Sequence, residues 1–474
     1  MKLKSFYLLL LLATIFTWSC EKDADIFAPV ISGAEVDTVL NIGDKLVLAP
    51  DITNLVGIGY TWLVNGEEVA SEQTDYTFTA TEPGNFVVTF RAANKGGAAD
   101  RVFNILVEAP IAIALQDGLS VARCQVLDIE PAITGPDRND YQYEWMLDDD
   151  LIGITRTLPF IALEAGDYTL TLIATAGKQS ATASCSITVE DAEYLNHAYA
   201  LVEYFPAPAK GFWWRPAGDN ALAYNDLLDY FTATKKGSQN YPVAVGSWGG
   251  YATFKFDHTV VDVPGDVDLE LRANCSVSDL PTVYVAYDHN KNGKPDDNEW
   301  YEIKNDDYGL EDLPDYEITF AYKDTDIESN PQGFSTSFTW KDNQEKPQQG
   351  EVANSSTWNA AFPLPGLVFS NGFFPGYYMK DKDSKEVVMA DGWQPSFTRK
   401  GKRITRDISG KPTYSQRMNL DIAKAVNANG ELVQLPGIDF VKIRKSVYTF
   451  EKEVDSNMNE DRMLIVRYII DKHL

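Results

Sequence analysis

The segment Pro83-Gly84-Asn85-Phe86-Val87-Val88-Thr89-Phe90 decides the fold, because the chain repeats it roughly 80 residues later as Ala165-Gly166-Asp167-Tyr168-Thr169-Leu170-Thr171-Leu172. In each copy a glycine turn is followed by apolar residues that alternate with polar ones. This alternation is typical of a strand that is buried on one face. A second matching pair, Tyr60-Thr61-Trp62 and Tyr143-Glu144-Trp145, lies upstream of the first. The sequence therefore predicts two copies of one β-rich unit.

Further matches extend the repeat to residues 28–109 and 110–191. Leu46–Thr53 corresponds to Leu127–Thr134. Short alternating runs separated by Gly, Pro, Asn and Asp turns predict a small antiparallel β-sandwich of immunoglobulin type in each copy. Trp62 and Trp145 are interpreted as core residues of these sandwiches.

The two units resemble PKD-like domains, on the Tyr-x-Trp strand and the Pro/Ala-Gly-x-aromatic strand. The glycine-aspartate-glycine turn of that family is replaced by Asn65-Gly66 in one copy and by Asp148-Asp149 in the other. The resemblance implies a pair of spacer modules on a cell surface.

Two cysteines occur in the second copy only. Cys124 aligns with Gly43 of the first copy, and Cys185 aligns with Phe103. Because exported proteins permit disulfides, we expect Cys124 and Cys185 to be bonded to each other.

The N-terminal residues have the pattern of an export signal. Lys2 and Lys4 precede the apolar run Phe6–Thr17, which is too short to span a bilayer, and Cys20 follows. The sequence predicts a lipoprotein signal peptide over residues 1–20, a lipid anchor on Cys20 and a tether over residues 21–27. The acidic residues after Cys20 resemble the surface-export tag of Bacteroidetes lipoproteins, so we expect the protein at the outer surface of the outer membrane. The alternative is an ordinary signal peptide with a chance cysteine.

The charge of the chain is strongly acidic, at −28. Removing Lys2 and Lys4 with the signal leaves 39 basic against 69 acidic side chains, a net charge of −30. Such a surface repels phosphate backbones, so nucleic-acid binding is not expected.

Residues 192–474 differ in composition, since aromatic residues become dense there. They include seven of the ten tryptophans. Strand-like runs dominate, and the best short helical candidates are Leu222–Phe231 and Ile422–Val426. We expect an all-β chain in which the two immunoglobulin-like sandwiches precede one large jelly-roll-like β-sandwich.

The stretch Asp288–Glu299 matches the twelve-residue calcium-binding pattern at every required position. The predicted oxygen ligands are the side chains of Asp288, Asn290, Asn292, Asp296 and Glu299 and the carbonyl of Lys294. Strand-like residues flank the loop, so the prediction is a structural Ca²⁺ in a β domain. The alternative is an acidic Asn-Gly hairpin without a metal.

Clustered aromatic residues are the candidates for ligand binding. Three consecutive aromatic side chains cannot all face one core in an extended segment, because side chains alternate along a strand. Aromatic rings can stack on a sugar or on a planar macrocycle. The predicted ligand-binding residues are Trp213, Trp214, Phe373, Phe374, Tyr377, Tyr378 and Trp393.

Catalysis is not expected. The four histidines lie outside any metal-ligand or triad spacing, and the sequence contains no glycine-rich phosphate loop. Paired carboxylates of a glycoside hydrolase could still lie among the 69 acidic residues.

The large C-terminal segment resembles that of PKD-bearing Bacteroidetes surface lipoproteins, including the BtuH-type cobamide-binding lipoproteins. The matching stretches include Phe254–His258, Asp288–Ile303, Ala390–Trp393 and Pro436–Lys442. The resemblance implies a non-enzymatic capture protein that passes a cobamide or a glycan to a TonB-dependent outer-membrane transporter. The alternatives are a structural or adhesive surface protein with a protein partner and, third, a glycoside hydrolase.

Overall fold

The computed structural model describes residues 26–33, 37–207, 224–275, 280–323, 336–347, 349–354, 377–379, 387–389, 396–407, 414–450 and 463–474. In these residues the regular secondary structure is almost entirely strand, with one α-helix, α2 (Tyr224–Gly237), and the short 3-10 helices η1 (Asp297–Glu299) and η2 (Ile422–Lys424). The all-β prediction is therefore confirmed. Among the described helices, none has the length and apolar character needed to cross a bilayer.

The fold divides into two compact units. The first comprises residues 1–118, 130–158 and 169–186, and the second comprises residues 119–129, 159–168 and 187–474. The second repeat is therefore divided between the units, and the predicted boundaries at residues 109 and 191 stay predictions.

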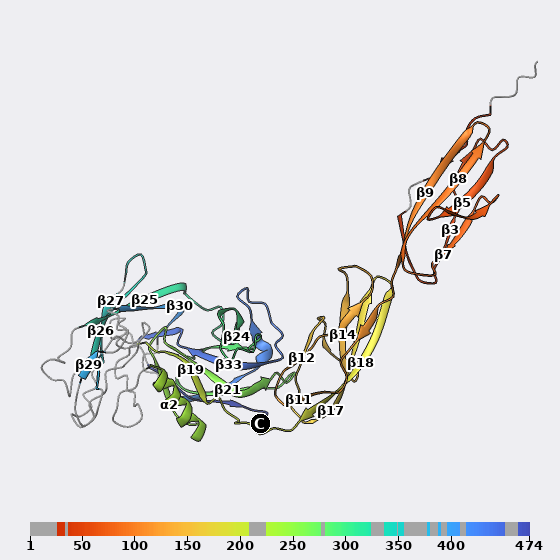
Figure 1. Cartoon of the computed structure of the whole chain (residues 1–474). Coiled ribbons are helices and arrows are strands. Elements are labelled where there is room, and N and C mark those ends of the chain that lie inside the picture. Colours follow the sequence, from red (N-terminus) through yellow and green to blue (C-terminus); the bar gives the residue numbers. More distant parts are fainter. Residues whose placement is uncertain are drawn as a thin grey trace, which may run out of the picture. The chain divides into compact units, whose positions relative to one another are not determined.

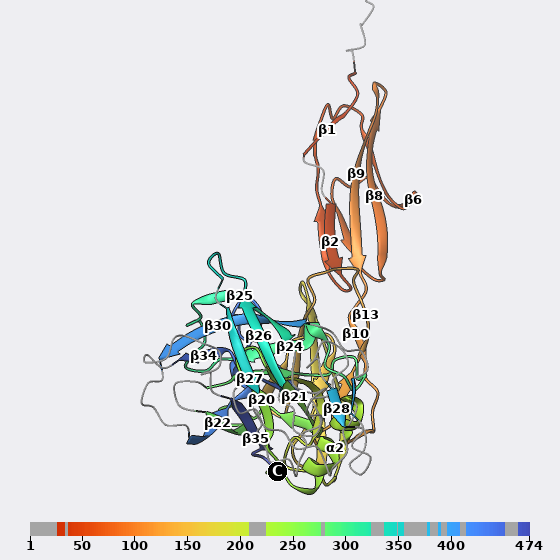
Figure 2. The ribbon, with the colours of Figure 1, turned by 90° about the vertical axis from the view of Figure 1, so that its left-hand side faces the viewer.

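The first repeat is a β-sandwich around Trp62, which is fully buried. Its five-stranded sheet has the order β2 (Asp37–Asn41), β9 (Gly97–Glu108), β8 (Gly84–Asn94), β5 (Gly59–Val64) and β6 (Glu67–Ser71). The pairs β1 (Val30–Ser32) with β4 (Asp51–Thr53) and β3 (Lys45–Leu48) with β7 (Tyr76–Thr79) complete it. Figure 2 shows β2, β9 and β8 side by side. The Trp62 indole N–H donates to the carbonyl of Gln73 at 3.1 Å, so the ring is buried without an unpaired donor.

The second repeat has the same strand order. Its five-stranded sheet runs β11 (Leu119–Ala122), β18 (Gln179–Glu190), β17 (Gly166–Ala176), β14 (Gln142–Leu147) and β15 (Asp150–Gly153). The small pairs are β10 (Ala112–Ala114) with β13 (Ala132–Thr134) and β12 (Leu127–Ile129) with β16 (Leu158–Phe160). Trp145 is fully buried and its indole N–H donates to the Thr155 carbonyl at 2.9 Å, much as Trp62 does to a carbonyl in the first copy.

The predicted disulfide between Cys124 and Cys185 is wrong, because both cysteines are free and buried. The parallel register of β11 and β18 explains this, since Leu119 lies beside Ile187 and Ala122 lies beside Glu190. Cys185 precedes this paired stretch and Cys124 follows it, which places them on the order of 20 Å apart along the strands. A disulfide needs Cα atoms within about 7 Å of each other.

The C-terminal region is built from three larger sheets (Figure 1). A six-stranded sheet has the order β19 (Ala200–Phe205), β21 (Tyr251–Val261), β33 (Gly437–Arg444), β23 (Thr282–Ala286), β24 (Trp300–Ile303) and β32 (Ala425–Val426). A four-stranded sheet has the order β20 (Val243–Gly246), β35 (Leu464–Asp471), β22 (Leu269–Cys275) and β31 (Tyr414–Leu420). A five-stranded sheet has the order β27 (Gln349–Asn354), β26 (Thr336–Asp342), β25 (Leu313–Lys323), β30 (Ser396–Asp407) and β34 (Val447–Phe450). The hairpin β28 (Tyr377–Met379) with β29 (Val387–Met389) is separate.

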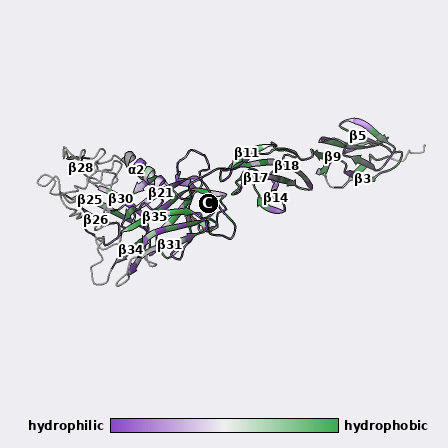
Figure 3. Ribbon diagram, turned by 90° about the horizontal axis from the view of Figure 1, so that it is seen from below, coloured by the Kyte–Doolittle hydropathy of each residue, from purple (hydrophilic) through white to green (hydrophobic). Residues whose placement is uncertain are grey.

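One hydrophobic core joins these three sheets. It contains residues of each, such as Phe254 from the first, Leu271 from the second and Phe320 from the third. Hydrophobic and hydrophilic residues lie close together along the strands in Figure 3. In β22 the alternation is strict, since every second residue from Leu269 to Cys275 is buried. Packing of the buried faces therefore holds the three sheets together. The outward faces and the loops are the surfaces on which a binding site can lie.

Candidate functional site

The calcium-type loop Asp288–Glu299 connects two adjacent antiparallel strands, β23 and β24, in which Ala286 pairs with Trp300. Its backbone turns sharply at Lys291 and Gly293, which have positive φ angles of 54° and 77°. A residue without a Cβ adopts such an angle at no steric cost, which explains the glycine at this position. The strands therefore hold both ends of the loop, and the glycine allows it to fold back.

Two buried carboxylates organise the loop from its ends. Asp288 accepts the backbone N–H of Asn292 at 3.0 Å and that of Gly293 at 2.7 Å. Glu299, which is 2 % exposed, accepts the N–H groups of His289 and Asp296, each at 3.1 Å. The first and last residues of the motif thus both direct their oxygens into the loop.

The middle residues of the motif lie close to one another. Asp296 Oδ2 accepts the side-chain amides of Asn290 at 2.6 Å and Asn292 at 2.9 Å. The amide oxygens of Asn290 and Asn292 accept backbone N–H groups of the loop at 3.0 and 2.7 Å. The Lys294 N–H donates the second of these bonds, and the predicted role of its carbonyl stays a prediction.

The loop carries oxygen donors of the kind that a hard divalent cation prefers. It combines three carboxylates and two amide oxygens in a short loop, and Ca²⁺ prefers oxygen ligands in flexible geometry. The charged head of Lys291 turns to Asp128, with which it forms an ion pair at 2.6 Å.

A polar pocket of about 440 Å³ lies beside the loop and shares residues with it. Its lining residues are Gln125, Val126, Tyr199, Lys255, Phe256, Asp257, His258, Thr259, Tyr287, Asp288, Lys291, Gly293 and Asp439. Its volume lies in the range of small-molecule sites.

Asp439 connects the pocket to the loop. One of its oxygens accepts the Thr259 hydroxyl at 2.6 Å, and the other accepts the backbone N–H of Asp288 at 2.8 Å. Burial raises the pKa of Asp439, while these two bonds oppose the shift. Burial, followed by the charges of Asp128 and Asp439, raises the pKa of Tyr287, so this phenol stays protonated. The pocket wall is therefore polar and held in place by its own hydrogen bonds.

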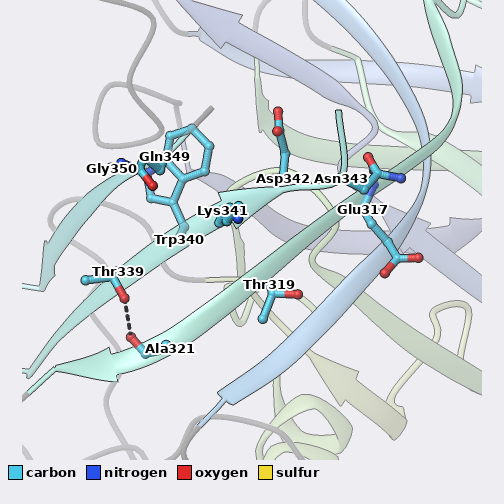
Figure 4. Close-up of a pocket in the computed structure, with 10 residues that line it drawn as sticks. All are labelled: Glu317, Thr319, Ala321, Thr339, Trp340, Lys341, Asp342, Asn343, Gln349 and Gly350. Carbon is cyan, nitrogen blue, oxygen red and sulfur yellow. Dashed lines mark hydrogen bonds between the residues drawn. The ribbon is translucent and has the colours of Figure 1, made fainter. Parts of the chain in front are cut away.

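A second hollow, of about 760 Å³, lies over the five-stranded sheet (Figure 4). Thr319 and Thr339 point away from the side on which Trp340 and Asp342 lie, and Thr339 donates to the Ala321 carbonyl at 3.4 Å. Trp340 and Asp342 are buried, while Thr319 and Lys341 are exposed. Asp342 is the buried carboxylate of this hollow and accepts the Tyr316 hydroxyl at 2.9 Å, but Thr319, Lys341, Asn343 and Gln349 are exposed. The loop-side pocket has more buried polar side chains, namely His258, Thr259, Tyr287 and Asp288, so it is the better-built site.

Most of the aromatic residues predicted to bind ligand lie outside the described residues. These are Trp213, Trp214, Phe373, Phe374 and Trp393. Cys20, the predicted lipid anchor, also lies outside the described residues. Tyr377 and Tyr378 are in β28, where they pair with Met389 and Val388 of β29. Their assignment to a ligand site stays a prediction.

Three further carboxylates meet in the second unit. Oxygen atoms of Asp262, Asp268 and Asp421 lie within 4.8 Å of one another. Asp268 is fully buried and accepts hydrogen bonds from the backbone of Val263 and Ile422 and from His473. Burial, followed by the charges of the other two carboxylates, raises the pKa of Asp262 to about 6.

The site residues predicted from the sequence do not include Tyr199, Lys255, Asp257 and Asp439. Three of them lie in stretches that carry the family resemblance, Phe254–His258 and Pro436–Lys442. The polar residues within these two stretches were the one feature of the sequence that could have indicated a binding site there. The pairing of β21 with β33 brings the two stretches together, and a local pattern does not encode this.

One family model matches part of the first repeat. Residues 29–94 match the family model of the PKD-like domain. A search of curated proteins found no match. Among solved structures, the chain is similar to titin domains I67-I69 at 13% identity, covering 69% of this chain and 97% of that chain, with a TM-score of 0.30.

Two other solved structures cover a smaller share of the chain. DIP-gamma IG1+IG2 has 15% identity, over 35% of this chain and 98% of that one, with a TM-score of 0.27. The fibronectin(III)-like modules of CbhA from Clostridium thermocellum have 14% identity, over 34% of this chain and 94% of that chain, with a TM-score of 0.20. Identities and TM-scores this low indicate nothing about the function of the chain. Residues 29–94 thus match the PKD-like domain, and the regular secondary structure of the described residues is almost entirely β-strand.

Proposed function

We propose that this protein is a lipid-anchored, non-enzymatic binding protein of the bacterial outer-membrane surface. It captures a small nutrient, a cobamide or a glycan, and passes it to a TonB-dependent transporter. The observation that carries the proposal is the polar pocket beside the loop Asp288–Glu299, in which His258, Thr259 and Asp288 are buried. Its volume of about 440 Å³ falls within the range of small-molecule sites, and its lining is mostly polar.

The loop holds a structural calcium ion in this proposal. The carboxylates of Asp288, Asp296 and Glu299 and the amide oxygens of Asn290 and Asn292 are the ligands. Extracellular modules bind calcium at roughly 10⁻⁴–10⁻³ M, a range available outside a cell. Because Asp288 also lines the pocket, the ion stiffens the wall that the ligand meets.

The anchor and the repeats complete the proposal. A lipid on Cys20 fixes the chain to the membrane, and the two repeats act as spacers. Incorporation of labelled palmitate into the wild-type protein and its loss in Cys20→Ala tests the anchor. Equal labelling of the two proteins would contradict it.

The capture function is tested by titration calorimetry of the full chain with cyanocobalamin and a panel of glycans in calcium buffer. We expect heat of binding with one of the two classes. Absence of heat with every compound contradicts capture.

An adhesive role is the second candidate, and one observation favours it. Val39, Val87, Val102 and Leu106 of the first repeat are 55%, 42%, 45% and 40% exposed. Val39 pairs with Leu106, and the neighbouring residues place all four on the outward face of one sheet. An exposed apolar group of this kind is typical of protein contact surfaces. Recovery of one specific protein by the wild type, and its loss in Val39→Ser, would favour adhesion.

A further inference from the structure

We infer that the pocket beside the calcium-type loop binds a neutral glycan segment of one or two sugar rings. The inference rests on the proposed capture function and goes further, because it names the site and chooses between the two ligand classes. The pocket is formed by β21, by Tyr199, by the loop and by Asp439.

Two carboxylates in the pocket are positioned to accept hydroxyl groups. Asp257 Oδ1 lies 2.9 Å from His258 Nδ1, and its Oδ2 accepts the backbone N–H of Leu195 at 3.1 Å. Asp439 is fixed in the same way by Thr259 and by the backbone of Asp288. An ionised carboxylate offers about four acceptor positions, so two or so remain on each of them. Both groups therefore have hydrogen-bond partners in the protein and can still accept further hydrogen bonds.

Lys255 lies on β21, the strand that also carries Asp257, and supplies hydrogen-bond donors. Its ammonium donates to the Gly293 carbonyl at 3.2 Å and lies 5.2 Å from the centre of the Phe440 ring. An ammonium carries three N–H donors, so others remain for a ligand. A sugar hydroxyl is both donor and acceptor, and it matches a wall on which carboxylates and an ammonium are neighbours.

The charge of the wall selects against an anion. Asp257, Asp288 and Asp439 line the pocket together with Lys255 and Lys291, and Lys291 is already paired with Asp128. The unbalanced carboxylates repel a negatively charged ligand, whereas a neutral polyol carries no such cost.

Size and polarity select against a cobamide. The corrin ring with its side chains and nucleotide is many times larger than one sugar ring, and its planar faces need wide apolar contact. The pocket holds about 440 Å³, and most of its lining residues carry polar side chains. Tyr199, which is half-buried, offers one aromatic wall of a size suited to a single sugar ring.

The test uses the full chain with 2 mM CaCl₂ (about the upper end of extracellular calcium affinities) and titration calorimetry. The probes are maltose, cellobiose, lactose, N,N′-diacetylchitobiose and cyanocobalamin. Tyr199→Ala and Lys255→Gln alter the pocket, and the first leaves every hydrogen bond of the loop in place. Lys341→Gln and Thr319→Ala are matched controls in the hollow over the five-stranded sheet. Circular dichroism and melting temperature confirm that each variant is folded.

The inference predicts that at least one disaccharide binds and that both pocket variants weaken it at least tenfold, with less than twofold change in the controls. Disaccharide binding that survives both pocket variants but is lost in Lys341→Gln overturns the site and leaves capture standing. Binding of cyanocobalamin alone overturns the ligand class and also leaves capture standing. Absence of binding by every probe overturns both proposals.

Discussion

Gly43 and Cys124 hold the same backbone position in the two repeats. Their φ angles are 91° and 57°, and their N–H groups donate to the carbonyls of Ala80 at 2.7 Å and Ala162 at 2.9 Å. A left-handed conformation costs a residue other than glycine about 1–2 kcal/mol. The full burial of the Cys124 side chain offsets part of that cost. Cys124 is therefore a packed turn residue, and its presence does not require a bonded partner.

We predict that Cys124 and Cys185 both react as free thiols when the protein is unfolded without reductant. Iodoacetamide labelling in guanidine followed by peptide mapping should find the label on both residues. Burial raises the pKa of Cys124 to about 11, so this thiol should react far more slowly in the folded protein at pH 8 (roughly the pKa of a free thiol). A peptide linking the two cysteines would contradict the register of β11 and β18.

Lys235 should make the stability of the protein rise with pH. It is 1% exposed, and its ammonium donates to the carbonyls of Tyr241 at 3.0 Å and Arg467 at 3.2 Å. Burial lowers its pKa to about 7, whereas an unfolded lysine titrates near 10.4. Between these values the unfolded state binds the extra proton, so the free energy of unfolding rises with pH, by at most about 1.4 kcal/mol per pH unit.

The measurement is urea unfolding between the two pKa values for wild type, Lys235→Met and Lys236→Met. Lys236 is the exposed neighbour on α2 and serves as control. The Lys235→Met substitution should flatten the pH slope, and the control should keep it. An unchanged slope in Lys235→Met would show that this lysine is not the titrating group.

Asp262 should make the stability of the protein fall as pH rises, in a lower pH range than that of Lys235. Its pKa is raised to about 6, so the folded state binds more protons than the unfolded state between about 4 and about 6. The free energy of unfolding therefore falls as pH rises through this window. In EDTA, Asp262→Asn should be more stable than wild type at pH 7 by on the order of 1–2 kcal/mol and nearly equal to it at pH 4.

Thermal unfolding at several pH values checks this, with Asp229→Asn on the exposed face of α2 as control. If Asp262→Asn changed stability by the same amount at pH 4 and at pH 7, titration of Asp262 in the carboxylate cluster would not be the cause of the change.

The two β-sandwich repeats and the loop between β23 and β24 could be predicted because local pattern encodes them. Trp62 and Trp145 recur in matching strands, and each becomes the fully buried centre of its sandwich. The helix predicted at Leu222–Phe231 begins at Tyr224 and continues to Gly237. Capping and periodicity locate a helix better than they locate its ends.

The pocket and the cysteines could not be predicted, for one shared reason. The position of Cys185 relative to Cys124 depends on a parallel register between strands far apart in the sequence. In the same way, Asp439 reaches Thr259 only through the pairing of β33 with β21. Alignment of two repeats shows which residues are equivalent, but it does not show which residues are in contact.

The most direct test of the account is a calcium titration of the full chain by calorimetry, with Glu299→Gln and Asp297→Asn. Glu299 is the buried carboxylate that closes the loop, whereas Asp297 is exposed and outside the ligand set. The account predicts one site with a Kd of roughly 10⁻⁴–10⁻³ M, weakened at least tenfold in Glu299→Gln and unchanged in Asp297→Asn. Absence of calcium heat in the wild type, or the same affinity in Glu299→Gln, would contradict it.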